Sequence, residues 1–133
     1  MSKDSDRKEV GKVGERIAAD FLGRKGYRIT IRNFRRPWGE IDLIGEKDGT
    51  VRFIEVKAVS RVTLPDVSRE MDGRPEELVD RRKLIKLART AALYMEMKHD
   101  EREYQIDVVG VIMVKSKRIA RCRLFEQALE DNL

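Results

Sequence analysis

Two runs of strand-forming residues, 40–47 and 50–59, meet at the dipeptide Asp48-Gly49. An Asp-Gly pair between two such runs favours a two-residue type I′ turn, because that turn needs positive φ at both central positions. The sequence therefore predicts an antiparallel hairpin at this point. No other feature limits the fold as closely, because a tight turn also sets the register of the strands that it joins.

A two-residue turn determines which side chains face each other across the hairpin. Asp42 then lies opposite Glu55, and Glu40 lies opposite Lys57. Side chains directly opposite on an antiparallel pair share one face of the sheet, with Cβ atoms about 4.5–5.5 Å apart. Glu55 and Lys57 also share a face, since alternate residues of a strand point the same way. This register predicts one patch of four charged side chains, which a bulge in either strand would break.

Asp42 and Glu55 are two carboxylates that repel each other unless a cation lies between them. The hairpin is otherwise rich in apolar residues, so we expect it to be substantially buried, where an unpaired like-charge pair is costly. The chain has one cysteine and one histidine, too few for a zinc site of those ligands, whereas carboxylates suit Mg²⁺ or Mn²⁺. The backbone carbonyl of Val56 would add a further oxygen ligand.

Such a set of groups suits phosphodiester hydrolysis. A metal ion lowers the pKa of a bound water and neutralises charge on the attacked phosphate. Lys57 would hold that water or stabilise the charge that develops in the transition state. The same residues could instead form a solvated cross-strand ion pair, worth about a few tenths of a kcal/mol. The apolar neighbours argue against this alternative.

We expect one domain spanning 1–133, because a chain of 133 residues is too short for two. The predicted order of elements is α-β-β-β-α-β-β-α, which indicates an α/β fold with a mixed sheet flanked by helices. Residues 1–7 should be frayed, and residues 60–76 should form a mobile loop. Three helices are predicted, over 8–25 with Gly26 as the stop, from 75 or 76 to 98, and over 125–131. Besides the hairpin, strands are predicted over 27–33, 104–114 and 118–124, the last as an edge strand. A basic turn is predicted over 34–39.

The chain contains no apolar run near the roughly 18 residues that span a membrane, and residues 1–10 lack the apolar core of a signal peptide. We therefore expect a cytoplasmic protein. The net charge is +5, and the excess of Lys and Arg lies in residues 1–36. A basic stretch beside an acidic cluster is suited to holding a polyanion next to a cation site, although it could equally be a solvated surface.

The segments Gly39–Ile44 and Phe53–Lys57 resemble the Asp…Glu-x-Lys core of restriction-endonuclease-like nucleases. The chain is more closely similar to the YraN family, also called UPF0102, which comprises small bacterial proteins related to archaeal Holliday-junction resolvases. The resemblance covers about residues 11–129. Further matching positions are Gly14-Glu15, Ala18, Leu22, Gly26-Tyr27, Arg32-Asn33-Phe34-Arg35, Lys83, Ala91, Tyr94, Asp107-Val108-Val109 and Phe125-Glu126-Gln127-Ala128-Leu129.

The resemblance implies a restriction-endonuclease-like fold and assigns roles to the matching positions. Asp42 and Glu55 would bind one or two Mg²⁺ or Mn²⁺ ions, Lys57 would be catalytic, and Glu15 would be the helix carboxylate that completes the site. Glu15 lies at the margin of the apolar helix face, which agrees with that role, but a salt bridge to a neighbouring arginine is the alternative. The family usually has Thr-Arg or a similar pair after the lysine, whereas Ala58 follows here. A homodimer is expected from the resemblance, because a four-way junction offers two matched strands.

Five basic residues are candidates for contacts with nucleic-acid phosphates. Arg32, Arg35 and Arg36 precede the Gly39–Ile44 segment, Arg61 follows the second strand, and Lys83 begins the long helix. Arginine side chains suit phosphate oxygens because their guanidinium group donates in a planar fork. The sequence shows no feature that reads base edges, so we expect recognition of branched or structured DNA by its shape.

The sequence thus favours a metal-dependent, structure-selective DNA nuclease. One alternative is a non-catalytic nucleic-acid-binding protein with a vestigial nuclease site. Another is a KH-type RNA-binding domain, because Gly11-Lys12-Val13-Gly14 matches a GxxG loop, although such a loop follows a strand and a helix that this chain has no room for. An interaction protein unrelated to nucleic acid would leave the acidic pair unexplained.

Overall fold

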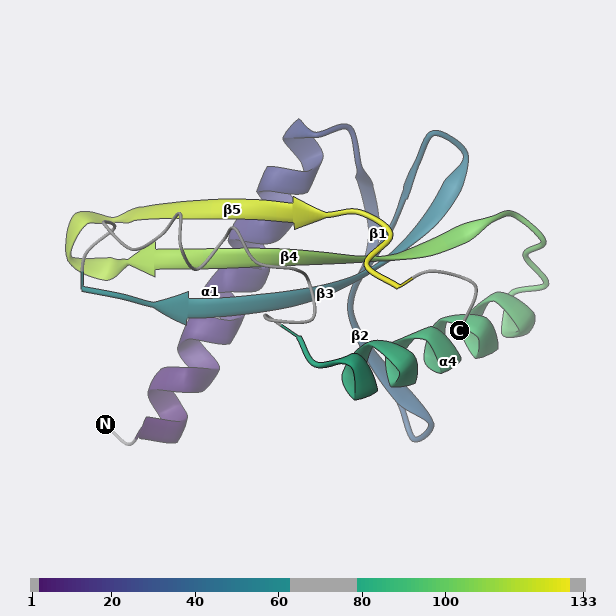
Figure 1. Ribbon diagram of the computed structural model, residues 1–133, viewed down its shortest axis with the longest axis horizontal. Coiled ribbons are helices and arrows are strands. Elements are labelled where there is room, and N and C mark those ends of the chain that lie inside the picture. Colours follow the sequence, from purple (N-terminus) through teal and green to yellow (C-terminus); the bar gives the residue numbers. More distant parts are fainter. Residues whose placement is uncertain (1–2, 63–78, 130–133) are drawn as a thin grey trace.

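The computed structural model describes residues 3–62 and 79–129, which form a five-stranded mixed sheet with one long helix on each face (Figure 1). This confirms the predicted α/β class, and the arrangement is compatible with a restriction-endonuclease-like fold. The elements are α1 (Lys3–Arg24), β1 (Arg28–Arg36), β2 (Gly39–Lys47), β3 (Thr50–Ser60), α4 (Arg81–Met97), β4 (Tyr104–Val114), a 3₁₀ turn (Lys115–Lys117) and β5 (Ile119–Phe125).

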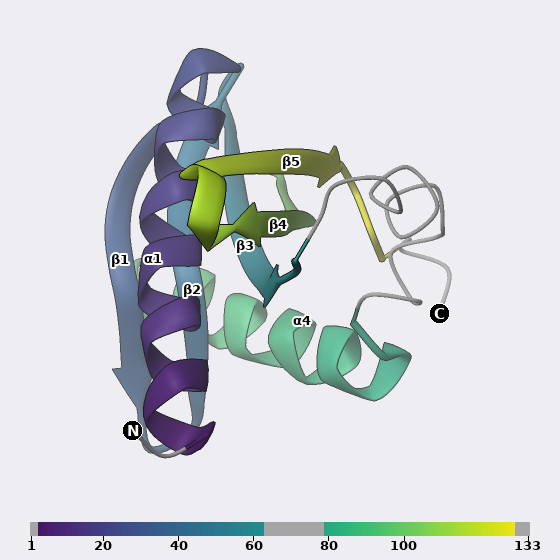
Figure 2. The ribbon, with the colours of Figure 1, turned by 90° about the vertical axis from the view of Figure 1, so that its left-hand side faces the viewer.

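The strand order is β1-β2-β3-β4-β5. Only β3 and β4 are parallel among these neighbours, and a parallel pair needs a long crossover connection, which here contains α4. Within the described residues, β5 pairs with β4 and with no other strand, so the predicted edge strand is confirmed. Figure 2 shows β1 and β2 running steeply across the direction of β4 and β5, so the sheet is strongly twisted.

The hairpin between β2 and β3 has the predicted turn and register. Both residues of its turn have positive φ, 51° and 76°. Backbone pairing runs from Lys47 opposite Thr50 to Leu43 opposite Ile54. The pairing then stops, so the predicted facing pairs beyond this point are not part of the backbone ladder.

Each helix covers its own hydrophobic core. The α4-side core contains the apolar stripe of α4 with Phe53 and Val108, and the α1-side core contains Leu22 with Ile54 and Val109. Neighbouring residues of β3 and β4 thus point to opposite faces, as strand geometry requires. The buried apolar residues of α4 lie at helical spacing: Leu84, Leu87, Ala91, Tyr94 and Met95, with Ala88 partly buried.

The helix boundaries differ from the predicted ones. The α1 helix begins at Lys3 rather than near residue 8, and Gly26 follows it with φ of 92°, as expected for a helix stop. The α4 helix begins at Arg81, because the Asp80 side chain caps it by accepting the backbone N–H of Lys83 at 3.1 Å. Most of the predicted loop over 60–76 lies outside the described residues.

Two predicted segments were wrong in their secondary structure. The basic turn over 34–39 is short, since β1 continues to Arg36 and β2 begins at Gly39. The C-terminal helix over 125–131 is not formed as far as the structure describes it, to residue 129. There the backbone N–H of Gln127 donates to Asp107 and that of Ala128 donates to the Ile106 carbonyl, so this segment is bound to β4. Gln127 has φ of 50°, in the left-handed region that a right-handed helix does not contain. None of the helices in the described ranges is long and apolar enough to cross a membrane.

Candidate metal and nucleic-acid site

The candidate site lies where the β2–β3 ladder opens. Beyond Leu43, β2 remains paired with β1, while β3 continues beside β4. Because the ladder is open here, no backbone carbonyl of β2 accepts the Val56 N–H. The side chain of Asp42 accepts this N–H instead, at 2.8 Å. A buried N–H needs an acceptor, so this bond fixes the Asp42 side chain between the two strands.

A twist in the β1–β2 pair turns Asp42 into this position. Ile41 and Ile44 both belong to the α4-side core, although regular alternation would put residues three apart on opposite faces. Opposite this stretch, Asn33 adopts a left-handed conformation with φ of 53°. Asparagine tolerates that conformation better than most residues, so the sequence supplies a suitable residue at the twist.

Three carboxyl groups converge on this opening. Asp42 lies within hydrogen-bonding contact of both Glu15 and Glu55. Glu55 is only 7 % exposed. Burial, followed by the charge of Asp42, raises the pKa of Glu55 from 4.5 to about 7, against the opposing effect of Lys83. Burial and Asp42 likewise raise the pKa of Glu15 to about 6, while Arg35 opposes the rise.

Glu15 reaches the sheet because α1 packs very closely on β3. A Cβ atom placed on Gly14 would lie 2.3 Å from the Cβ of Ala58, so only glycine fits there. With the Asn33 amide turned so that its nitrogen faces Glu15, this nitrogen donates to both carboxylate oxygens of Glu15 at 3.2 Å. The close helix approach and this amide thus hold Glu15 beside Asp42.

The oxygen donors suit a hard divalent cation, but they are not arranged as a closed cage. Across residues 3–62 and 79–129, no three acidic, histidine or cysteine side chains are grouped as a ready metal site. Asp42 is shared by two carboxyl pairs instead, and the Glu55 Oε1 atom forms an ion pair with the Lys83 Nζ at 2.6 Å. Mg²⁺ commonly uses one or two carboxylates and keeps several waters, so the Asp42–Glu55 pair fits that mode of binding.

A cleft of about 690 Å³ lies beside Asp42 and Glu55. The tip of the β1–β2 hairpin and the first half of α4 form its walls. Trp38 lines it while packing against Phe34, with ring centroids 5.7 Å apart. The charged residues lining the rest of the cleft are Arg36, Glu40, Asp80, Arg82, Lys83 and Lys86.

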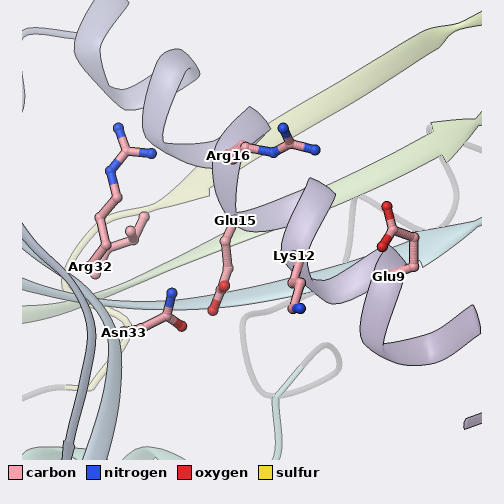
Figure 3. Close-up of a pocket in the computed structure, with 7 residues that line it drawn as sticks. Glu9, Lys12, Glu15, Arg16, Arg32 and Asn33 are labelled. Atoms are coloured by element: carbon pink, nitrogen blue, oxygen red, sulfur yellow. The ribbon is translucent and has the colours of Figure 1, made fainter. Parts of the chain in front are cut away.

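A second hollow of about 330 Å³ lies on the other side of the acidic cluster, between α1 and β1. Figure 3 shows Glu15 and Asn33 pointing toward one another within it. The basic residues that line it are Lys12, Arg16 and Arg32. The acidic cluster therefore lies between two hollows that both carry basic side chains.

The structure places the predicted site residues as follows. Glu15, Asp42 and Glu55 come together. Lys57 is exposed and lies on the Glu55 face of β3, because the intervening Val56 packs into the α1-side core. Glu40 pairs with β1 instead of facing Lys57, since the ladder has already opened. A metal-binding role for the Val56 carbonyl stays a prediction.

The predicted phosphate contacts are spread over a wider surface. Arg32 lines the smaller hollow, Arg36 lines the cleft, and Arg35 lies close enough to Glu15 to lower its pKa. Arg61 is exposed just after β3, and its guanidinium donates to the Ser60 carbonyl at 3.0 Å. Lys83 pairs with Glu55, a contact that the sequence did not predict.

Comparison with known proteins decides the family. The sequence profile described as "Uncharacterised protein family UPF0102" matches residues 14–111. A UPF0102 protein of Moorella thermoacetica is 37% identical over 123 residues, which cover 92% of this chain and 96% of that protein. The chain belongs to the UPF0102 family. Further UPF0102 relatives are one from Syntrophomonas wolfei, 38% identical over 113 residues (83% and 90% of the two chains), and one from Dictyoglomus thermophilum, 36% identical over 116 residues (86% and 91%).

The UPF0102 match confirms the resemblance to the YraN family, and the matched range includes the three carboxylates, Lys57 and Lys83. Ala58, which follows Lys57, packs against the α1-side core and lies against Gly14, so this position does not face the cleft. A small side chain is needed there for the helix to approach.

Proposed function

We propose that this UPF0102 protein is a metal-dependent nuclease that hydrolyses phosphodiester bonds in branched or structured DNA. The observation that carries the proposal is the contact between the Asp42 and Glu55 carboxyl groups at the open end of the β2–β3 ladder, beside a cleft with basic walls. Two desolvated carboxylates in contact call for a cation, and the cleft offers room for a strand.

Asp42 and Glu55 would hold the metal, with Glu15 and the Val56 carbonyl as further oxygen ligands. A bound Mg²⁺ or Mn²⁺ supplies an activated water and neutralises phosphate charge. The Val56 N–H fixes the orientation of the Asp42 carboxylate, so the ligand is preorganised. Lys57 would hold the attacking water or stabilise the growing negative charge.

The walls of the cleft would bind the phosphates on either side of the scissile bond. Arg36 stacks on the Phe34 ring, 4.5 Å from the ring centroid, which limits the orientations of its guanidinium. Arg82 and Lys86 lie along α4 on the other wall. These contacts would position a strand without reading its bases, which supports selection by shape.

The proposal is tested by incubating the protein with flap, four-way-junction, duplex and single-stranded DNA in Mg²⁺ or Mn²⁺. We expect cleavage of a branched substrate and a loss of at least about 10²-fold in rate in Asp42→Asn, Glu55→Gln and Lys57→Ala. Glu40→Gln is the matched control, because Glu40 is an acidic residue of the same strand as Asp42 and lines the same cleft. It should keep near wild-type activity.

Equal cleavage by wild type and all variants would contradict the assignment of the site. Binding of DNA without metal-stimulated cleavage, unchanged in Asp42→Asn, would instead identify a nucleic-acid-binding protein with a vestigial nuclease site.

A further inference from the structure

Lys83 already supplies a positive charge at the acidic pair. Its Nζ lies 2.6 Å from Oε1 of Glu55, whose side chain is 9% exposed. The charge of Asp42 acts on Lys83 as well and raises its pKa, so both carboxylates favour a charged ammonium here. The Asp80 cap fixes the first turn of α4 through the Lys83 backbone N–H, and this places the side chain within reach of the pair.

A metal ion and this ammonium compete for the same carboxylate. A divalent cation coordinates carboxylate oxygens at about 2.0–2.6 Å. An ammonium on the same carboxylate would then lie within about 4 Å of the ion, and two positive charges at that separation repel, so metal binding weakens the Lys83–Glu55 pair. The Lys83 side chain is 61% exposed, so it can leave the carboxylate without any movement of α4.

We propose that Lys83 is a cation that the site exchanges for its divalent metal, and that the released ammonium then binds a phosphate of the substrate strand in the cleft. The inference rests on the proposed function. Lys83 lines that cleft beside Arg82 and Lys86, so a strand bound there offers the ammonium a new anionic partner. Lys83 is thus a positioning residue that links occupation of the metal site to occupation of the cleft.

The exchange has two consequences. Without a strand, wild-type protein binds metal more weakly than a variant that lacks the ammonium, because displacing Lys83 opposes metal binding. With a strand present, the phosphate stabilises the displaced lysine, so the strand tightens metal binding. Linkage requires that the metal tighten strand binding by the same factor.

The experiment is calorimetric titration of Mn²⁺ into wild type, Lys83→Met and Lys83→Gln. Lys98→Met is the control, because Lys98 lies at the other end of the same helix and does not line the cleft. Each titration is run with and without a phosphorothioate oligonucleotide, which resists hydrolysis. We expect both Lys83 variants to bind Mn²⁺ about three- to tenfold more tightly than wild type in the absence of DNA. The oligonucleotide should tighten Mn²⁺ binding in wild type and Lys98→Met more than in the Lys83 variants.

The outcomes separate this inference from the proposed function. If Mn²⁺ binds wild type, is lost in Glu55→Gln, and binds the Lys83 variants no more tightly, the exchange is wrong while the metal site stands. Equal tightening by DNA in all four proteins would overturn the phosphate contact of Lys83. Absence of Mn²⁺ binding in every protein would overturn both the exchange and the proposed metal site.

Discussion

Gly14 lies where α1 crosses β3, and substituting it tests how Glu15 is brought to the site. A Cβ atom at Gly14 would lie 2.3 Å from the Ala58 Cβ, whereas two carbon atoms pack favourably at about 3.5–4.0 Å. To reach that spacing, helix and strand must move apart by about 1.2–1.7 Å in Gly14→Ala. Overpacking of this size costs about 1–3 kcal/mol, of which the better helix propensity of alanine offsets about 1 kcal/mol.

Gly11→Ala is the matched control, because a Cβ at Gly11, on the same helix, would meet no atom within 4 Å. Urea denaturation should show Gly11→Ala to be more stable than wild type by about 0.5–1 kcal/mol and Gly14→Ala to be less stable than Gly11→Ala by about 1–3 kcal/mol. Adding Ala58→Gly to Gly14→Ala removes the colliding methyl group and should recover part of the loss. A double-mutant cycle measures that coupling.

The displacement also carries Glu15 away from Asp42. A misplacement of about 1 Å can cost up to about 10²-fold in rate, so cleavage of branched DNA should fall in Gly14→Ala and recover in the double variant. If Gly14→Ala proved as stable as Gly11→Ala, with no coupling to position 58, the close approach of α1 to β3 would not be what positions Glu15.

Three further predictions concern pH, the core and the cleft. The pKa of Glu55 rises on folding from 4.5 to about 7, so ionisation of this carboxyl opposes folding as pH rises through that range, by up to about 3 kcal/mol. In urea denaturation with chelator present, the stability of Glu55→Gln relative to wild type should therefore increase between pH 4.5 and pH 8. A difference that does not change with pH would contradict this. Asp107→Asn should lose about 2–4 kcal/mol of unfolding free energy, because the fully buried carboxylate accepts a 2.6 Å hydrogen bond from Tyr27 and pairs with the buried Arg52. In chemical denaturation this loss should far exceed that of Asp100→Asn, whose carboxylate pairs with the exposed Arg102, and losses of similar size would contradict the prediction. In fluorescence anisotropy, Arg82→Ala should weaken DNA binding and reduce the slope of log affinity against log salt concentration by about 1. Lys98→Ala, at the other end of the same helix, should change neither, and equal effects of the two variants would place the DNA elsewhere.

The local part of the fold could be predicted from the sequence. The Asp48-Gly49 turn fixed the hairpin register through Leu43 and Ile54, because a two-residue turn allows only one pairing. The strand over Tyr104–Val114 was predicted from its run of strand-forming residues, and the long helix from its helical periodicity.

Long-range contacts account for most of what could not be predicted. The β2–β3 ladder ends at Leu43, and the local sequence pattern does not show where two strands separate. The pairing of Arg52 with Asp107 joins residues distant in sequence and is buried inside runs that read as apolar strands. The Asp80 cap was a local signal that could have located the start of α4.

Among the site residues, the sequence placed Asp42 and Glu55 together for a partly incorrect reason. They meet through their side chains where the ladder has opened, and not as a backbone pair within it. The partnership of Lys83 with Glu55 depends on how α4 packs against β3, which no spacing within either element reveals.

The proposed metal site is tested most sharply by the position of Mn²⁺ in crystals of the metal-loaded protein, located by anomalous scattering. We expect a peak about 2.0–2.3 Å from carboxylate oxygens of both Asp42 and Glu55, with the Lys83 ammonium moved into the cleft. A peak elsewhere, or no peak between these carboxylates at millimolar Mn²⁺, would contradict it.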